Sequence, residues 1–333
     1  MTLVSLVVPV YHNAPSLPDL LAAFQALSAR NPHDQFEFVF VDDGSGDNSH
    51  AVLLDLQTAE PRMRVFKLSR NFGSNPAIMA GLSQARGEAV AAIAADLQDP
   101  PELIHDMLEK WRQGHKVILA ARASRDDPGL TSLLADAFYA LFRRFAIKTM
   151  PQRGFDFFLL DRQVVDHINA IQESNPYLMG LILWLGFDPQ VIYYDRRARP
   201  AQYGISMWTL AKKIKYFIDS FVAFSYLPVR AASVLGFILS GIGGLYAIIV
   251  ILARILFGID VEGWTSLMVV LLIIGGVQMV MIGILGEYLW RNLDETRKRP
   301  RFIIEHASES QHVSLPDGIN DSNGLSEPLT NEP

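Results

Sequence analysis

Two long stretches without a charged residue place the strongest constraint on how this chain folds. Ala231–Ala253 and Trp264–Gly286 are each about 23 residues long and consist mostly of apolar and small side chains. At a rise of about 1.5 Å per residue, a helix of that length crosses the ~30 Å hydrocarbon core of a bilayer. Two helices buried in a soluble core are the alternative, but such helices are rarely so long and uncharged. The sequence therefore predicts two transmembrane helices within residues 230–290.

The charges around these stretches predict their orientation. The connector Gly258–Gly263 carries acidic charges only, at Asp260 and Glu262. The flanking segments carry basic residues: Lys212, Lys213, Lys215 and Arg230 before the first stretch, and Arg291, Arg297, Lys298, Arg299 and Arg301 after the second. By the positive-inside rule, both flanks face the cytoplasm and the connector lies outside.

The sequence pattern of residues 204–229 predicts amphipathic helices ahead of the first span. Apolar residues recur there at helical spacing, while Lys212, Lys215 and Asp219 fall on the other side. Such a helix either lies in the plane of the membrane surface, with its lysines toward lipid head groups, or packs on the preceding domain. Its position directly before a membrane span favours the interface.

The segment 291–333 is expected to be cytoplasmic, and disordered from about Ala307 because Ser, Asn, Asp and Pro dominate it. The chain has 29 Lys and Arg against 35 Asp and Glu, and six of those acids follow Ile304. The rest of the chain is therefore neutral, which argues against nucleic acid as a partner. The chain contains no cysteine, so any metal must bind to oxygen or imidazole ligands.

The first part of the chain alternates short apolar runs with helix-length amphipathic segments, a pattern typical of a parallel sheet covered by helices. Strands are predicted at Ser5–Val10, Phe36–Val41, Arg64–Leu68, Ala89–Ala95 and Val117–Ala120. Helices are predicted near Ser16–Arg30, Ser49–Ala59, Pro76–Ala85, Pro101–Gln113 and Asn175–Gly186. We therefore expect an α/β domain over residues 1–203, with its chemistry in the loops beyond the carboxyl ends of the strands.

Polar residues follow the first two predicted strands. Pro9 and Tyr11 follow the first, and Asp42-Asp43-Gly44-Ser45 follows the second. A carboxylate there can accept hydrogen bonds from a base or a ribose, although Asp-Asp-Gly-Ser is also a common turn sequence. No Gly-x-Gly-x-x-Gly follows the first strand, which argues against a dinucleotide-binding Rossmann domain.

After the fourth predicted strand, Asp96 and Gln98 lie two residues apart and share a side if the backbone stays extended. Oxygen ligands of this kind suit Mg²⁺ or Mn²⁺ bound to a diphosphate. The alternative is a helix cap, because Asp99 precedes Pro100-Pro101-Glu102.

Taken together, these loops resemble glycosyltransferase family 2, whose members have the inverting GT-A fold. The similarity is to its polyisoprenyl-phosphate branch, which includes dolichyl-phosphate mannose synthases and bactoprenol glucosyltransferases. It runs from Leu3 to about Pro300. The matching segments are Val8-Pro9-Val10-Tyr11, Val41-Asp42-Asp43-Gly44-Ser45, Ser69-Arg70-Asn71-Phe72-Gly73, Ala80-Gly81-Leu82, Asp96-Leu97-Gln98-Asp99-Pro100-Pro101-Glu102 and the two apolar stretches.

The resemblance implies roles for the donor-side residues. Pro9 and Tyr11 would frame the nucleotide pocket, with Asp42 and Asp43 binding the nucleotide sugar. Asp96 and Gln98 would hold Mg²⁺ or Mn²⁺ on the donor diphosphate, with Asp99 as a further candidate. The family commonly has another acid two residues before Asp96, where this chain has an alanine.

The resemblance also implies an acceptor side. Relatives present arginine to the acceptor phosphate after the fifth strand, where this chain has Arg122 and Arg125. Asp156 is the candidate for orienting the acceptor or the sugar, or for acting as a base. A capping role for Asp156 and surface ion pairs for the arginines are the alternatives.

The sequence thus resembles an enzyme that transfers a sugar from a nucleotide diphosphate donor to a polyisoprenyl phosphate, with inversion, at the bacterial cytoplasmic membrane. Its catalytic domain and both termini would be cytoplasmic. UDP-glucose and undecaprenyl phosphate are the preferred substrates, while mannose, galactose and amino sugars stay open, as does homo-oligomerisation. The alternative is a non-catalytic scaffold or lipid-linked-sugar translocator. A processive polysaccharide synthase is disfavoured, because the chain lacks further spans and a Gln-x-x-Arg-Trp segment.

Overall fold

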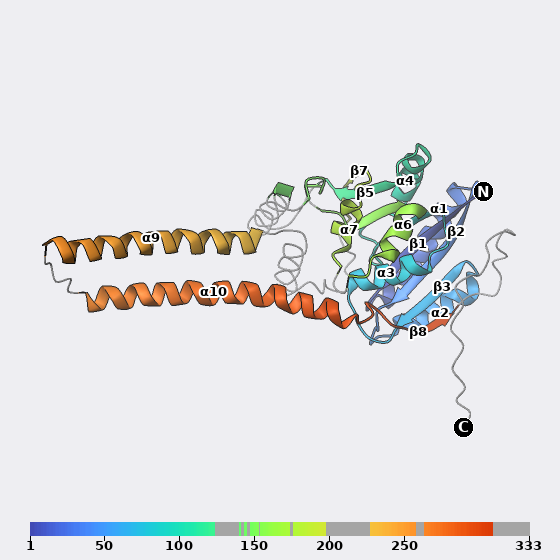
Figure 1. The fold of residues 1–333 in the computed structure, drawn as a ribbon. Coiled ribbons are helices and arrows are strands. Elements are labelled where there is room, and N and C mark those ends of the chain that lie inside the picture. The colour runs from blue at the N-terminus through green and yellow to red at the C-terminus, as the bar shows by residue number, and fades with distance from the viewer. Residues whose placement is uncertain are drawn as a thin grey trace, which may run out of the picture.

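The computed structural model describes residues 1–123, 140, 143–144, 147–152, 154–173, 176–197, 227–257 and 263–308. These residues form an α/β domain and two long helices that run side by side away from it (Figure 1). After the second long helix, the chain returns to the α/β domain and adds a strand to its sheet. The predicted interface helices lie, up to residue 226, outside the described residues.

One mixed sheet organises the α/β domain. Its strands are β1 (Thr2–Val10), β2 (Asp34–Asp42), β3 (Met63–Leu68), β4 (Ala89–Ala92), β5 (Val117–Arg122), β6 (Phe157–Asp161), β7 (Pro189–Tyr194) and β8 (Ile304–Ser308). Their order across the sheet is β7-β5-β6-β4-β1-β2-β3-β8. Neighbouring strands pair in parallel except around β6 and β8, which pair antiparallel to their neighbours. The five predicted strands are present, and the predicted GT-A class of α/β fold is confirmed.

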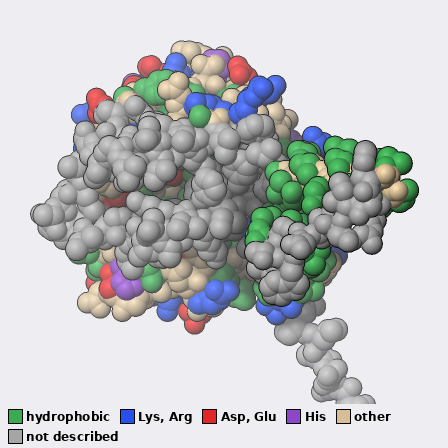
Figure 2. Space-filling model, turned by 90° about the vertical axis from the view of Figure 1, so that its left-hand side faces the viewer, with side chains coloured by type: hydrophobic (Ala, Val, Ile, Leu, Met, Phe, Trp, Pro, Cys, Tyr) green, Lys and Arg blue, Asp and Glu red, His purple; other side chains and the backbone are tan. Residues whose placement is uncertain are grey.

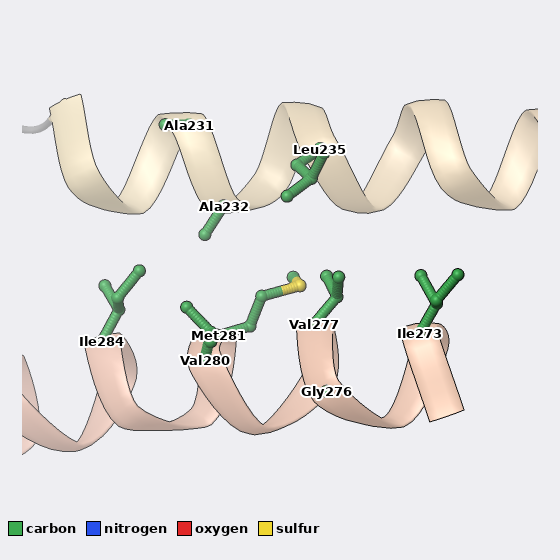
Figure 3. A pocket seen from close by; sticks show the side chains of 9 residues that line it. All are labelled: Ala231, Ala232, Leu235, Ile273, Gly276, Val277, Val280, Met281 and Ile284. Carbon is green, nitrogen blue, oxygen red and sulfur yellow. The ribbon is translucent and has the colours of Figure 1, made fainter. Parts of the chain in front are cut away.

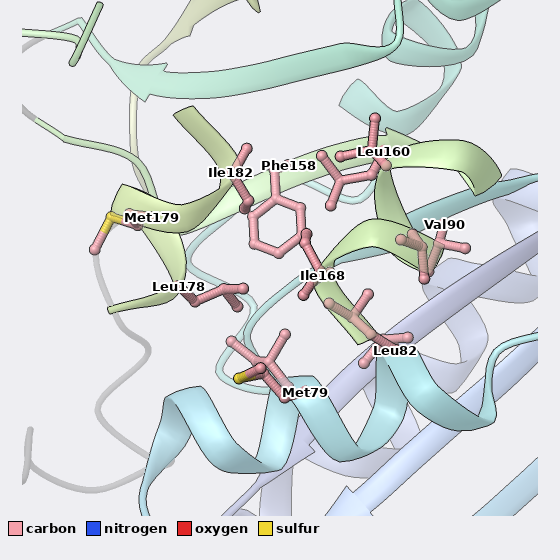
Figure 4. Packing of buried hydrophobic residues seen from close by; sticks show 14 of the residues in the cluster. Met79, Leu82, Val90, Phe158, Leu160, Ile168, Leu178, Met179 and Ile182 are labelled. Atoms are coloured by element: carbon pink, nitrogen blue, oxygen red, sulfur yellow. The ribbon is translucent and has the colours of Figure 1, made fainter. Parts of the chain in front are cut away.

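Helices cover both faces of this sheet. They are α1 (Leu17–Arg30), α2 (Ser49–Ala59), α3 (Ser74–Gln84), α4 (Leu103–Arg112), α6 (Arg162–Ala170) and α7 (Leu178–Trp184), with a short 3₁₀ helix η1 (Ala14–Ser16) ahead of α1. Successive side chains of β1 point to opposite faces, so Val7 joins one apolar cluster while Leu6 and Val8 join the other. Figure 4 shows the first cluster, where Phe158 of β6 meets Met79 of α3 and the apolar side chains of α6 and α7.

The strand β8 was not predicted from the sequence, and it extends the sheet up to Ser308, close to the predicted onset of disorder at about Ala307. Ala307 pairs with Phe66 and Ser308 with Val65, in antiparallel register with β3. The edge of β3 offers unpaired backbone groups, and hydrogen bonding to them holds these residues in the sheet. An ion pair of 3.4 Å between Lys67 and Glu305 also joins the two strands. Residues beyond 308 lie outside the described part of the chain.

The long helices α9 (Leu227–Phe257) and α10 (Trp264–Arg297) coincide with the two predicted spans. The most apolar 18-residue windows within Val229–Ala253 and Val269–Arg297 have mean hydropathies of 2.4 and 2.5, and 0% of each window is buried. Figure 2 shows hydrophobic side chains gathered on this hairpin, in contrast to the mixed surface of the α/β domain. The two helices are therefore long and apolar enough to cross a membrane, and they are not core helices of the α/β domain.

An apolar groove of about 570 Å³ separates α9 from α10 (Figure 3). It is lined by Ala231, Ala232, Leu235, Ile273, Gly276, Val277, Val280, Met281 and Ile284. None of these side chains carries a hydrogen-bonding group that would recognise a sugar or a phosphate. The polar site must therefore lie on the α/β domain.

A buried ion pair stabilises the sheet near the amino ends of its central strands. Nη1 of Arg64 in β3 lies 3.3 Å from Oε2 of Glu37 in β2, and both side chains are 5% exposed. The hydroxyl of Ser5 and the backbone N–H of Arg86 donate to Oε1 of the same carboxylate, at 2.5 and 2.6 Å. Glu37 therefore depends on neighbouring groups, rather than on water, to compensate its buried charge.

We expect Arg64→Leu to destabilise the protein by about 3–5 kcal/mol, because it leaves the charge of Glu37 buried without its ionic partner. Lys67→Leu is the matched control, since it removes the more exposed pair with Glu305 and should cost no more than about 1 kcal/mol. Thermal unfolding of the full-length protein in detergent measures both. Equal losses in melting temperature would show that the buried pair has no special weight.

Asp43 joins the end of β2 to the loop after β3. Its side-chain oxygens accept hydrogen bonds from the backbone N–H groups of Phe72, at 2.7 Å, and Gly73, at 2.9 Å. Burial raises the pKa of Asp43 to about 6, although these two N–H groups act in the opposite direction. Close packing at this junction also requires Gly44, because a Cβ there would lie 2.5 Å from the backbone carbon of Arg70.

This pKa predicts a pH dependence of stability. The folded-state value of about 6 exceeds the ordinary value of 3.8, so folding favours the protonated carboxyl. The contribution of Asp43 to the free energy of unfolding is complete below about pH 3.8 and is lost as the pH rises through about 6. The wild type should therefore lose stability relative to Asp43→Asn between about pH 4.5 and about pH 7.5. Melting temperatures of both proteins at the two pH values test this, and a constant difference contradicts it.

Candidate active site

The candidate site lies at one edge of the sheet, where the carboxyl ends of the parallel strands meet. The pairing places the end of β1 beside the end of β2, with Val10 opposite Asp42. The loops after β1, β2, β4, β5 and β7 start from this edge. Because β6 runs antiparallel to β4 and β5, its first residues lie at the same edge. Asp156, which directly precedes β6, therefore lies there too.

The loops after β1 and β2 are held together by hydrogen bonds. The backbone N–H of His12 donates to the Ser45 hydroxyl at 3.1 Å, and that of Asn13 donates to the Ser49 hydroxyl at 2.9 Å. His12 has a φ of 55°, a left-handed conformation that turns the chain sharply after Tyr11. The Tyr11 ring contacts the His12 ring edge-on, with 4.4 Å between centroids. Pro9 and Tyr11 are half-buried beside these contacts.

Asp42 is fully buried at the base of this part of the site. Its Oδ1 accepts a hydrogen bond of 3.0 Å from the Ser45 backbone N–H, while its Oδ2 lies 3.7 Å from Nδ1 of His50. Burial lowers the pKa of His50, although Asp42 acts to raise it. Neither Oδ2 of Asp42 nor Nδ1 of His50 has a hydrogen-bond partner among the described residues. Both atoms are therefore left to bind a further polar group.

The loop after β4 carries Asp96 and Gln98. Oδ1 of Asp96 accepts a hydrogen bond of 3.3 Å from the Gln98 backbone N–H, across Leu97, whose φ is 56°. The backbone is thus turned between the two residues, and the extended arrangement assumed from the sequence is wrong. The hydroxyl of Ser16 donates to the Ala95 carbonyl at 2.7 Å, which connects this loop to the end of the β1 loop.

The donor set at Asp96 fits a divalent cation only in part. In the described ranges, no group of three or more His, Asp or Glu side chains is arranged to hold a metal ion. Asp96 and Gln98 instead supply one carboxylate and one amide, both half-buried. Mg²⁺ is often held by one or two carboxylates together with substrate phosphates, so this pair suits a cation that arrives with a diphosphate.

Asp99 is buried and held by residues at the end of β7 and after it. It is 1% exposed, and its Oδ1 accepts hydrogen bonds from the Tyr194 hydroxyl and from Nε of Arg196, the latter at 3.0 Å. Burial, followed by the neighbouring Asp99, raises the pKa of Tyr194, which keeps its hydroxyl protonated as a donor. Oδ2 of Asp99 has no hydrogen-bond partner among the described residues, so a share of Asp99 in metal binding stays a prediction.

Arg122 lies at the end of β5 and pairs with Asp156. Its guanidinium Nη2 is 3.0 Å from Oδ2 of Asp156. Burial lowers the pKa of Arg122, but Asp156 and Asp99 outweigh that effect and the pKa is raised overall. The arginine is therefore firmly charged. Arg125, the other arginine predicted for this role, lies outside the described residues.

The sequence reasoning missed Tyr194, the last residue of β7, and the residues that follow it. Tyr194 and Arg196 contact Asp99, and the backbone N–H of Arg197 donates to the Gln98 carbonyl at 2.9 Å. These contacts bring the loops after β4 and β7 together. The run Asp195-Arg196-Arg197 directly after an apolar segment was the available signal, but the strand itself was not recognised. His50 was missed as well, because it lies within a helix that the sequence presents as an ordinary crossover.

Sequence comparisons show which known proteins this chain is similar to. The family model described as "Glycosyl transferase family 2" matches residues 5–168. An uncharacterized glycosyltransferase of Bacillus subtilis is 36% identical over 302 residues, which cover 90% of this chain and 93% of that protein. The bactoprenol glucosyl transferase of Shigella phage SfV is 34% identical over 307 residues, or 92% of this chain and 99% of that protein. A prophage bactoprenol glucosyl transferase homolog of Escherichia coli is 34% identical over 311 residues, with the same two coverages.

The similarity extends over the hairpin as well as the α/β domain, since these matches cover more than nine-tenths of each chain. The segments that form the sheet, its polar loops and the hairpin therefore all lie within the part of the chain that these relatives match. The chain is a glycosyltransferase that belongs to glycosyl transferase family 2 and is homologous to the bactoprenol glucosyl transferases.

Proposed function

We propose that this protein transfers glucose from UDP-glucose to undecaprenyl phosphate at the cytoplasmic face of the bacterial membrane, with inversion at the anomeric carbon. The product is a lipid-linked monosaccharide used to modify cell-envelope glycans. The observation that carries the proposal is the combination of polar loops at one sheet edge with an exposed apolar hairpin. The names of the relatives point to the same donor sugar and lipid.

The donor is assigned to the loops after β1, β2 and β4. Tyr11 and Pro9 would flank the nucleoside, and the free acceptor atom of Asp42 would receive an N–H of the base. Because Asp42 is fully buried and its Oδ2 lies only 3.7 Å from Nδ1 of His50, the base would reach this oxygen only after the His50 side chain moves aside. Asp43 would act indirectly, since its two oxygens already hold the loop after β3.

Asp96 and Gln98 are the residues that would hold Mg²⁺ or Mn²⁺ against the donor diphosphate. When bound, such an ion neutralises charge that develops on the leaving diphosphate. The protein itself positions the ligands of this ion. The turn at Leu97 and the hydrogen bond from Ser16 fix the loop that carries Asp96.

The acceptor phosphate is assigned to Arg122. The second pKa of a phosphate monoester is near ~6, so its oxygen is ionised at neutral pH and needs no strong base to become a nucleophile. A guanidinium can bind two phosphate oxygens at once and so orient the third toward the sugar. Asp156, next to Arg122, would orient the acceptor or the sugar.

The hairpin explains how a soluble sugar nucleotide meets a membrane lipid. A polyprenyl chain stays in the hydrocarbon layer, and its phosphate lies at head-group level. Both ends of the hairpin connect to the α/β domain, through residues 195–226 and 298–303. The active site would thus be held near the lipid phosphate, which reduces the entropy cost of bringing donor and acceptor together.

Incubating the purified protein with radiolabelled UDP-glucose, undecaprenyl phosphate and Mg²⁺ or Mn²⁺ tests the function. We expect label to enter the organic phase only when the lipid phosphate is present. Parallel reactions with labelled mannose, galactose and amino-sugar nucleotides identify the sugar. If no nucleotide sugar labels the lipid, the alternative of a scaffold or translocator is favoured and the proposed reaction is wrong.

Asp96→Asn should lower the rate of transfer by at least about 100-fold, because it removes the only carboxylate assigned to the diphosphate-bound cation. Asp106→Asn is the matched control, since Asp106 is exposed on α4 and should leave the rate within about twofold. Initial rates and melting temperatures of both variants provide the comparison. Full activity in Asp96→Asn would reject its assignment to the metal.

A further inference from the structure

Arg122 pairs directly with one exposed carboxylate, and the charge of a second, buried carboxylate also acts on it. The side chain of Asp156, 3.0 Å away, is 58% exposed. Asp99, the other acid that raises the pKa of Arg122, is 1% exposed. An exposed ion pair is weak and exchanges readily with solvent or with another anion, whereas a buried one is costly to break.

Asp99 is fixed by Tyr194, the last residue of β7, and by the loop that follows it. The hydroxyl of Tyr194 and Nε of Arg196 both donate to its Oδ1. Next to it, the backbone carbonyl of Gln98 accepts from the N–H of Arg197 at 2.9 Å. Asp99 is therefore connected to both arginines, directly to Arg196 and to Arg122 through Tyr194, which lies opposite Arg122 in the pairing of β5 with β7.

Asp156 has no comparable restraint in the described residues. It lies in the turn before β6, where its side chain pairs with Arg122. Two guanidiniums thus face two carboxylates when no ligand is bound. A phosphate monoester, with a charge of about −1.5 to −2, would be repelled by Asp156 if that carboxylate stayed on Arg122.

We propose that Arg122 exchanges partners when the acceptor binds: the lipid phosphate displaces Asp156, while Asp99 keeps Arg122 and Arg196 aligned. Asp156 is then a competitor for the phosphate site, and Asp99 and Tyr194 are positioning residues for it. The inference rests on the proposed function and deepens it, because it adds Arg196 to the acceptor site. In this exchange, Asp156 leaves Arg122 only when the acceptor has arrived, and its carboxylate is then available beside the bound phosphate.

The exchange predicts opposite effects from two aspartates that act on the same arginine. Asp156→Asn removes the competitor, so the acceptor should bind about two- to fivefold more tightly, although turnover falls. Asp99→Asn removes the buried carboxylate that aligns the arginines, so the acceptor should bind at least about tenfold more weakly. Tyr194→Phe keeps the Asp99 charge but loses one hydrogen bond, and should weaken binding about threefold.

The experiment measures binding of farnesyl phosphate to the full-length protein in detergent by calorimetry, without any donor, so that no chemical step contributes. Farnesol serves as the ligand without a phosphate and should bind much more weakly. Glu102→Gln is the matched control, because Glu102 pairs with Arg197 at an exposed position 3.4 Å away and should change the Kd by less than about twofold. Melting temperatures identify variants that fail to fold. If Asp99→Asn fails to fold, Tyr194→Phe tests the alignment of the arginines instead.

Three outcomes would overturn the exchange. The first is an unchanged or raised Kd in Asp156→Asn, as expected if Asp156 only stabilises the turn before β6. The second is equal tightening of binding by Asp156→Asn and Glu102→Gln, which indicates a general charge effect. The third is wild-type binding by folded Asp99→Asn and Tyr194→Phe proteins. If the wild type transfers sugar to the lipid, these results leave the proposed function intact, whereas equal binding of farnesol and farnesyl phosphate contradicts the function itself.

Discussion

The parallel pairing of β1 with β2 and β4 is the constraint on which the rest of the structure depends. It fixes Val10 beside Asp42, and it aligns the short strand β4 so that the loop carrying Asp96 leaves from the same edge. The crossover helices pack on the two faces and seal the apolar sides of the strands. Only the loops at the carboxyl ends are then free to carry polar groups. The position of the candidate site is thus a consequence of strand direction.

Within that edge, burial determines which charges are fixed and which can move. Asp43 and Asp99 are almost fully buried, and each is held by two hydrogen bonds that join separate loops. These carboxylates organise the site because a buried charge keeps whatever partners it has. Asp156 is exposed and holds a single described ion pair, so its geometry can change when a ligand binds. A carboxylate therefore stabilises the fold at Asp43 and at Asp99, whereas the carboxylate of Asp156 remains available for function.

The hairpin is tied to this domain more closely than a simple anchor requires. The chain enters α9 after the loop that follows β7, whose Arg196 and Arg197 contact the β4 loop. It leaves α10 and adds β8 to the other edge of the sheet, where Lys67 pairs with Glu305. The last described residues before the hairpin and the strand that follows it thus lie at opposite edges of one sheet.

The sequence by itself determined the α/β class, the five strands β1 to β5, the crossover helices near the predicted bounds and the two apolar spans, because hydrophobic periodicity and uncharged length are local properties. It also indicated Asp42, Asp96 and Arg122 as site candidates, since strand-end positions can be read along the chain. Only the tertiary structure decided that Asp99 holds Arg196, that His50 faces Asp42, that Leu97 turns the metal loop and that residues 304–308 join the sheet. Each of these four features depends either on contacts between segments far apart in sequence or on a single backbone angle. Neither kind of feature leaves a periodic signal in the sequence.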